Sequence, residues 1–219
     1  LGIYVMDEGW DMWYKRKTRY DYALHFMEDY EEDIRAMVST DYNHPSVIMY
    51  SIGNEISEPG TTEGIELAGT LADGFRCLDD TRLITVGCNI TILAGSKAGN
   101  ETFDPDSDGT IGEDMANMGD MDSTKFNEMA SQAGTMMEGA ANSPEADEAS
   151  IPVYSKVDIA GYNYACGRYQ MDGKLHPDRV IVGSETFPQN IYRNWGYVKE
   201  MPYVIGDFMW TAMDYIGEA

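Results

Sequence analysis

The sequence predicts an α/β fold in which helices alternate with the strands of a parallel sheet. Six short apolar runs rich in Val, Ile and Tyr recur along the chain, and several are too continuous for a strand with one solvated face. Longer stretches with helical spacing of apolar residues lie between these runs. With 219 residues, the chain is long enough to bury a sizeable core.

The first half of the chain shows this alternation most clearly. An uninterrupted apolar run predicts a strand at residues 2–6, and the amphipathic stretch at 19–40 predicts a helix with an acidic outer face. A strand at 47–52, a helix at 61–78 and a strand at 83–86 follow. Because the chain opens inside an apolar run, we expect it to be a segment of a longer protein, with any targeting signal outside it.

The second half predicts three more strands and one more long helix. Continuous apolar runs predict strands at 157–162 and 180–183, each followed by polar residues. A helix is expected at 190–200, and the aromatic run at 203–210 predicts the last strand.

Residues 98–150 interrupt the alternation. They hold 13 acidic residues and one basic residue, and they lack Tyr and Trp. We interpret them as an insertion after the third strand, mostly loop, with one helix around 123–139. Because the segment is acidic and poor in aromatic residues, we expect weak order and little contact with the core.

One part of this insertion resembles a metal-binding loop. Asp104, Asp106 and Asp108, followed by Gly109, match the start of an EF-hand calcium loop. The twelfth position should supply a bidentate Glu, but it is Met115. We therefore expect a solvated acidic turn and no metal.

The overall composition excludes several classes of partner. The chain has 38 acidic and 15 basic residues, a net charge of −23, which disfavours nucleic acid because phosphate binding requires clustered Lys and Arg. No apolar run approaches the ~20 residues needed to span a membrane. The three cysteines match neither a zinc site nor a disulfide framework, which indicates free thiols and a cytoplasmic location.

Two of the expected strands lead into a glutamate. The run at 47–52 continues to Asn54 and Glu55, and the run at 180–183 continues to Glu185. The carboxyl ends of parallel strands meet on one side of the sheet, where partial burial raises a carboxyl pKa toward the value that a general acid needs. Such a pair is the minimum equipment for glycoside hydrolysis. For Asn54 and Glu55, the alternative interpretation is that the two residues cap a helix.

Aromatic residues near the ends of the strands are suited to stacking on sugar faces. Each one alone is more typical of a core, but their shared placement at strand ends favours a carbohydrate site. We expect Trp10 and Trp210 to be among the residues that contact the substrate. The full set is Trp10, Trp13, Tyr162, Tyr164 and Trp210.

Several segments resemble glycoside hydrolase family 2, in the order that the family has them. Residues 43–55 resemble its acid/base motif, with details typical of β-galactosidases. Residues 1–13 resemble the third barrel strand and its loop, 158–164 the sixth strand and 182–185 the seventh. Residues 206–218 are similar to the eighth strand of galactosidase-like members. The resemblance implies a partial (β/α)8 TIM barrel, with about six of eight βα units, strands 3 to 8.

The resemblance also implies roles for individual residues. Glu55 would be the acid/base and Glu185 the nucleophile of a retaining hydrolase that cleaves terminal β-D-galactosides through a covalent glycosyl-enzyme intermediate. Asn54 would bind the sugar 2-hydroxyl, Tyr164 would contact the nucleophile, and Trp210 would form an apolar wall.

Other functions stay open at this stage. β-Glucuronidases and β-mannosidases of the same family share the two carboxylates, and a non-catalytic carbohydrate-binding or scaffold fragment is the alternative from another class. Metal-dependent members carry Glu and His where this chain has Met12 and Tyr14, so we expect no metal and no cofactor. The whole chain, 1–219, is interpreted as a fragment of the catalytic barrel domain.

The absence of the first two barrel units has a physical consequence. Closing eight strands fixes their tilt and stagger, so a barrel that begins at the third strand keeps two open edges. Open edges and uncovered apolar side chains favour pairing with another chain. We therefore expect a homo-oligomer, and we expect the isolated segment to be inactive.

Overall fold

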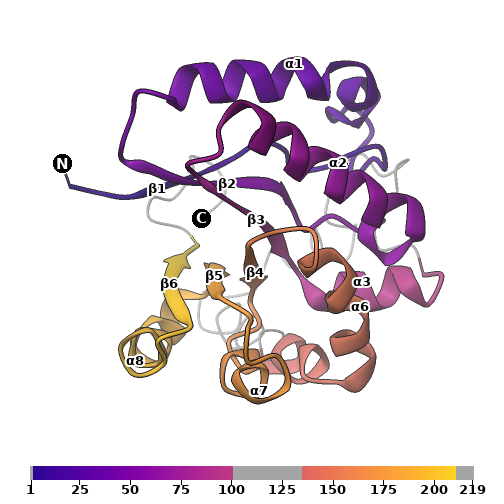
Figure 1. Cartoon of the computed structure of the whole chain (residues 1–219). Coiled ribbons are helices and arrows are strands. Elements are labelled where there is room, and N and C mark those ends of the chain that lie inside the picture. Colours follow the sequence, from indigo (N-terminus) through magenta and orange to yellow (C-terminus); the bar gives the residue numbers. More distant parts are fainter. Residues whose placement is uncertain (1, 101–134, 211–219) are drawn as a thin grey trace, which may run out of the picture.

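The computed structural model of the chain describes residues 2–100 and 135–210. Within them, six parallel strands form one sheet whose order follows the sequence. The sheet curls into a half-barrel with helices around its outer side (Figure 1). The strands are β1 (Val5–Glu8), β2 (Val47–Asn54), β3 (Leu83–Cys88), β4 (Ile159–Asn163), β5 (Ile181–Thr186) and β6 (Val204–Met209).

Helices connect successive strands, as parallel pairing of neighbours requires. Sequential parallel strands with helical crossovers confirm the α/β fold and the partial TIM barrel. No helix in the described ranges is long and apolar enough to cross a bilayer. The helices are α1 (Ala23–Asp41), α2 (Thr62–Leu78), α3 (Ile90–Lys97), α6 (Pro144–Tyr154), α7 (Arg168–Leu175) and α8 (Ile191–Glu200), with short 3-10 turns η1 (Glu58–Gly60) and η2 (Pro188–Asn190).

Apolar side chains pack on both faces of the sheet, as expected for parallel strands covered on both sides. Met49, Ile159 and Val182 form a small buried cluster on one face. A larger cluster on the other face joins the strands to the helices, and there the rings of Tyr50 and Phe75 stack with centroids 4.8 Å apart. Because successive strand residues point to opposite faces, Met49 and Tyr50 belong to different clusters.

A buried polar network fastens α7 to the sheet and to α6. Arg168 of α7 is fully buried and forms ion pairs with Asp147 and Asp172. Arg179 donates hydrogen bonds of 2.8 Å to Asp172 and to the hydroxyl group of Tyr162 on β4. A buried charge is tolerated only when it is paired, so removing one member would leave the others uncompensated.

The described sheet has one edge at β1 and one at β6. Apolar side chains are exposed beside both edges: Ile3 and Tyr4 are 63% and 71% exposed, and Ile205 and Met209 are 47% and 40% exposed. Unpaired strand edges with apolar neighbours are sites at which another chain can pair.

The predicted insertion at 98–150 lies only partly within the described residues. Residues 101–134, which include the acidic turn and most of the helix expected at 123–139, lie outside them. The end of the segment differs from the prediction of a loosely attached loop, because Ala146 and Ala149 of α6 are buried in the main core. Little contact with the core was expected because the segment is poor in aromatic residues. The small side chains of α6 nevertheless let this helix pack against α3.

Candidate active site

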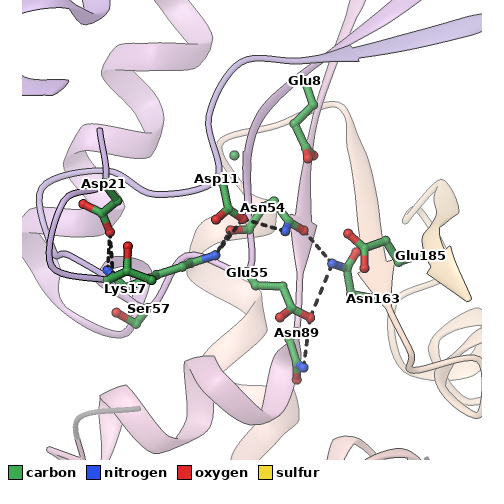
Figure 2. A network of polar contacts seen from close by, with 12 residues as sticks. Glu8, Asp11, Lys17, Asp21, Asn54, Glu55, Ser57, Asn89, Asn163 and Glu185 are labelled. Atoms are coloured by element: carbon green, nitrogen blue, oxygen red, sulfur yellow. Dashed lines mark hydrogen bonds and ion pairs between the residues drawn. The ribbon is translucent and has the colours of Figure 1, made fainter. Parts of the chain in front are cut away.

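Polar side chains from five neighbouring strands gather at the C-terminal side of the half-barrel (Figure 2). Glu8 ends β1, Glu55 follows β2, Asn89 follows β3, Asn163 ends β4, and Glu185 lies on β5. Parallel strands point the same way, so side chains that are distant in sequence lie together at this end of the sheet.

Glu55 follows β2 in a left-handed backbone conformation, with φ of 46°. A residue with a Cβ is strained there, and such strain is typical of functional sites. Two hydrogen bonds hold the turn: the Asn54 N–H donates to the carbonyl of Trp10 at 2.9 Å, and the Glu55 N–H donates to that of Gly87 at 2.7 Å. The carboxyl Oε1 of Glu55 accepts a hydrogen bond from Asn89 Nδ2 at 3.1 Å.

Glu185 is held by two hydrogen bonds from Tyr164. The tyrosine hydroxyl donates to Glu185 Oε2 at 2.7 Å, and the tyrosine N–H donates to the glutamate carbonyl at 2.9 Å. Tyr164 is also left-handed, with φ of 56°. Burial raises the pKa of Glu185, the hydrogen bond from Tyr164 lowers it, and the charge of Glu55 raises it again. The two glutamates therefore interact electrostatically.

Asn163 links the two strands that carry the glutamates. Its buried amide Nδ2 donates to Oδ1 of Asn54 at 2.7 Å and makes a longer contact of 3.5 Å with Glu55 Oε1. Its Oδ1 accepts a hydrogen bond of 2.6 Å from the hydroxyl group of Ser184, the neighbour of Glu185. This bridge sets the orientation of the Asn54 amide beside Glu55.

Glu8 faces the same concave space, as Figure 2 shows. Its Oε2 accepts a hydrogen bond of 2.7 Å from the hydroxyl group of Ser51 on β2. The residue as a whole is exposed, but the protein around its carboxyl group desolvates that group and raises its pKa to about 7. The Ser51 hydrogen bond opposes this rise in the pKa of Glu8, and the charge of Glu185 adds to it.

The raised pKa predicts a pH-dependent contribution of Glu8 to stability. The folded chain holds the Glu8 proton more tightly than the unfolded chain, whose ordinary pKa is 4.5. This contribution is present below about pH 4.5 and is lost as the pH rises through about 7. We therefore expect the Tm of Glu8→Gln, relative to wild type, to increase steadily between pH 5 and pH 8.

Thermal melts of both proteins across this pH range measure the effect. Glu28→Gln, on the exposed face of α1, is the matched control for the loss of one carboxylate. A Tm difference for Glu8→Gln that follows the control at every pH would contradict the raised pKa of Glu8.

The two tryptophans expected to contact substrate have different environments. Trp10 is 5% exposed, its indole N–H donates to Asp33 at 3.0 Å, and its ring packs edge-on against Phe26. This position corrects the expectation of a sugar platform, because the chain after β1 turns the ring toward α1. Trp210 is 48% exposed, and its backbone N–H donates a hydrogen bond to the carbonyl of Thr186, the residue after Glu185.

Sequence reasoning did not single out Glu8, Asn89 or Asn163, although each lies at or just after the end of a strand. Asn89 was hidden because β3 extends to Cys88, two residues beyond the expected end. For Asn89 and Asn163 the signal is a polar residue directly after a buried apolar run, whereas Glu8 follows Asp7 on the partly exposed strand β1.

The described residues contain one group close enough to share a cation, formed by Asp147, Asp172 and His176. Asp147 lies on α6, Asp172 lies on α7 and His176 directly follows α7, so the group is not at the strand ends. Arg168 already forms ion pairs with both carboxylates, which satisfies their charge.

Comparison with known proteins supports a specific family. The family described as glycosyl hydrolases family 2, TIM barrel domain, matches residues 1–156. The chain is 29% identical over 255 residues to β-galactosidase BoGH2A of Bacteroides ovatus, covering 100% of the chain and 28% of that protein.

Two solved structures share the fold of this chain. A glycosyl hydrolase family 2 member from Bacteroides cellulosilyticus matches with a TM-score of 0.69 and 33% identity, over 98% of this chain and 21% of that one. A β-glucuronidase from Bacteroides uniformis, 16% identical with a TM-score of 0.50, covers 92% of this chain and 23% of its own and shares the fold.

The chain thus spans less than a third of the length of each of these relatives. The family match covers most of the chain, and the parallel strands and their helical crossovers are those of a TIM barrel. The chain belongs to glycoside hydrolase family 2.

Proposed function

We propose that the chain is part of a longer retaining β-galactosidase, here called the parent hydrolase, with Glu55 as acid/base and Glu185 as nucleophile. The observation that carries this proposal is the pair of carboxylates at the ends of β2 and β5, which interact electrostatically and have different hydrogen-bond donors. Amide groups surround Glu55, whereas the hydroxyl group of Tyr164 donates to Glu185.

The proposed reaction has two steps. Glu185 attacks the anomeric carbon while Glu55 donates a proton to the departing glycosidic oxygen, which forms a covalent glycosyl-enzyme. Glu55 then removes a proton from water, and the water releases the sugar with its original anomeric configuration. Retaining enzymes hold the two carboxyl groups about 5–5.5 Å apart, and we expect this separation here.

Three neighbours support the reaction in this proposal. Tyr164 stabilises the ionised form of Glu185 through its hydrogen bond. The Asn54 amide is oriented by Asn163, and its remaining hydrogen-bonding capacity is available to the sugar 2-hydroxyl. Trp210 is the exposed aromatic residue at the end of β6 and supplies the apolar wall.

The likeness to BoGH2A favours a β-galactoside as substrate. A β-glucuronidase or β-mannosidase with the same two carboxylates is the alternative, and a structural neighbour is described as a β-glucuronidase. A non-catalytic carbohydrate-binding or scaffold role is less well supported, since it has no use for backbone strain at Glu55 and Tyr164.

A substrate panel tests the proposal. The parent hydrolase is incubated with 4-nitrophenyl β-galactoside, β-glucuronide and β-mannoside, beside its Glu185→Gln variant. We expect hydrolysis of the galactoside by wild type alone, and NMR during the first turnovers should show the β-anomer as first product. An α-anomer would contradict retention, and preferred hydrolysis of another glycoside would reassign the substrate.

A further inference from the structure

Lys17 contacts the turn that carries the candidate acid/base. Its ammonium group donates a hydrogen bond of 2.9 Å to the carbonyl of Asn54 and one of 3.0 Å to Asp11 Oδ1. The Asn54 amide Nδ2 donates to the same Asp11 oxygen at 2.9 Å. Figure 2 shows this triangle beside Glu55.

The backbone around Lys17 is fixed by its own contacts. Asp21 Oδ2 accepts hydrogen bonds from the N–H groups of Lys17 at 2.6 Å and Thr18 at 2.9 Å. Earlier in the loop, the indole N–H of Trp13 donates to the carbonyl of Ile52 at 2.8 Å. The loop after β1 therefore presents the ammonium group from an anchored base.

The contact with Asn54 has more consequence than the ion pair with Asp11. The Lys17 side chain is 12% exposed but that of Asp11 is 56% exposed, and an ion pair with such an exposed partner contributes little stability. The Asn54 carbonyl belongs to the peptide bond that enters the strained Glu55 residue. A donor at this carbonyl fixes the plane of that peptide, and with it the direction of the Glu55 side chain.

Lys17 also places positive charge among carboxylates. Its charge lowers the pKa of Glu8 and of Glu185, whereas the charge of Asp11 raises both pKa values. The groups that act on Glu185 come from the loop after β1 and from β1, β2 and β4. They are Glu8, Asp11, Lys17, Glu55 and Tyr164.

We propose that Lys17 is a positioning residue of this hydrolase, which holds the Asn54–Glu55 peptide so that Glu55 faces the glycosidic oxygen. The inference rests on the proposed function for the roles of the two glutamates. In this proposal, the Lys17 ammonium group orients the backbone that carries Glu55, and its positive charge supports this role by acting on the neighbouring Glu185.

The kinetic test uses Lys17→Met in the parent hydrolase with two aryl β-galactosides. Phenyl galactoside needs a proton on its leaving oxygen, and 2,4-dinitrophenyl galactoside does not. A general acid contributes about 10²–10⁴-fold, so we expect a loss of about tenfold or more in kcat on the phenyl substrate. The loss on the dinitrophenyl substrate should be much smaller, and Lys17→Arg should restore most of the activity.

A second measurement is independent of substrate identity. The rate at which a water-soluble carbodiimide labels Glu185, followed by peptide mass spectrometry, reports the protonation of this carboxyl. We expect the pH midpoint of labelling to rise in Lys17→Met and to fall in Asp11→Asn, which keeps the acceptor oxygen but loses the charge. The second variant keeps the test decisive if the first one does not fold.

Lys15→Met is the matched control, because the charge of Lys15 acts on Glu58 in the neighbouring turn. Equal losses on both galactosides together with an unchanged labelling midpoint would overturn the proposal, as would full activity of Lys17→Met. A parent hydrolase that cleaves no galactoside while the two midpoints shift in opposite directions would overturn the substrate assignment but retain the role of Lys17.

Discussion

Glu185→Ala in the parent hydrolase is expected to lower the rate of galactoside hydrolysis by several orders of magnitude. In the proposed mechanism, the variant removes the group that forms the covalent bond to the sugar. Glu55 stays in place to protonate the leaving group. Steady-state rates with 4-nitrophenyl β-galactoside measure the loss.

Azide distinguishes a missing nucleophile from a damaged fold. A small anion can enter the space left by the carboxylate and attack from the opposite sugar face, which gives an inverted glycosyl azide. We expect partial recovery of the rate and an α-galactosyl azide as product, identified by NMR. Wild-type turnover by Glu185→Ala would remove Glu185 from the role of nucleophile.

Produced alone, the 219-residue chain is expected to lack measurable hydrolysis and to associate with itself. The sheet ends at β1 and β6, and Ile3, Tyr4 and Ile205 are exposed beside these edges. A barrel needs eight strands to close, and parallel edges with uncovered apolar side chains pair readily. We therefore propose a homo-oligomer in which the open edges meet.

Light scattering coupled to gel filtration measures the mass of the chain directly. Double replacement of Ile3 and Ile205 by lysine is the control, because charged residues at strand edges oppose pairing. The replacement should shift the chain toward monomer without restoring activity. A stable wild-type monomer that hydrolyses galactosides at the rate of the parent would contradict both parts of the prediction.

Much of the fold could be predicted from the alternation of apolar runs and amphipathic stretches. The expected strand at 47–52 and helix at 61–78 correspond closely to β2 and α2. The first strand begins at Val5 rather than at residue 2. The residues before Val5 are apolar like those of a core strand, and the sequence does not show that they lack a strand to pair with. The short helices α3 and α7 were not predicted, since eight residues show little periodicity.

Part of the candidate site was predictable from acidic residues that stand shortly after an apolar run. Glu55 and Glu185 were identified in this way, and the structure brings both to the same end of the sheet. Side-chain direction was not predictable, so Trp10 was expected at the sugar but lies in the core. The contact of Lys17 with Asn54 joins residues 37 positions apart, and only tertiary structure specifies such a contact.

The left-handed residues Glu55 and Tyr164 have a consequence for engineering and for evolution. A side chain in this conformation costs about 1–2 kcal/mol, which glycine would avoid and asparagine would reduce. A thermostability screen of the barrel would therefore reward Gly or Asn at both positions and select inactive proteins. A fragment maintained only as a scaffold would be expected to drift toward the same replacements, whereas a working hydrolase would be expected to keep Glu and Tyr at these positions.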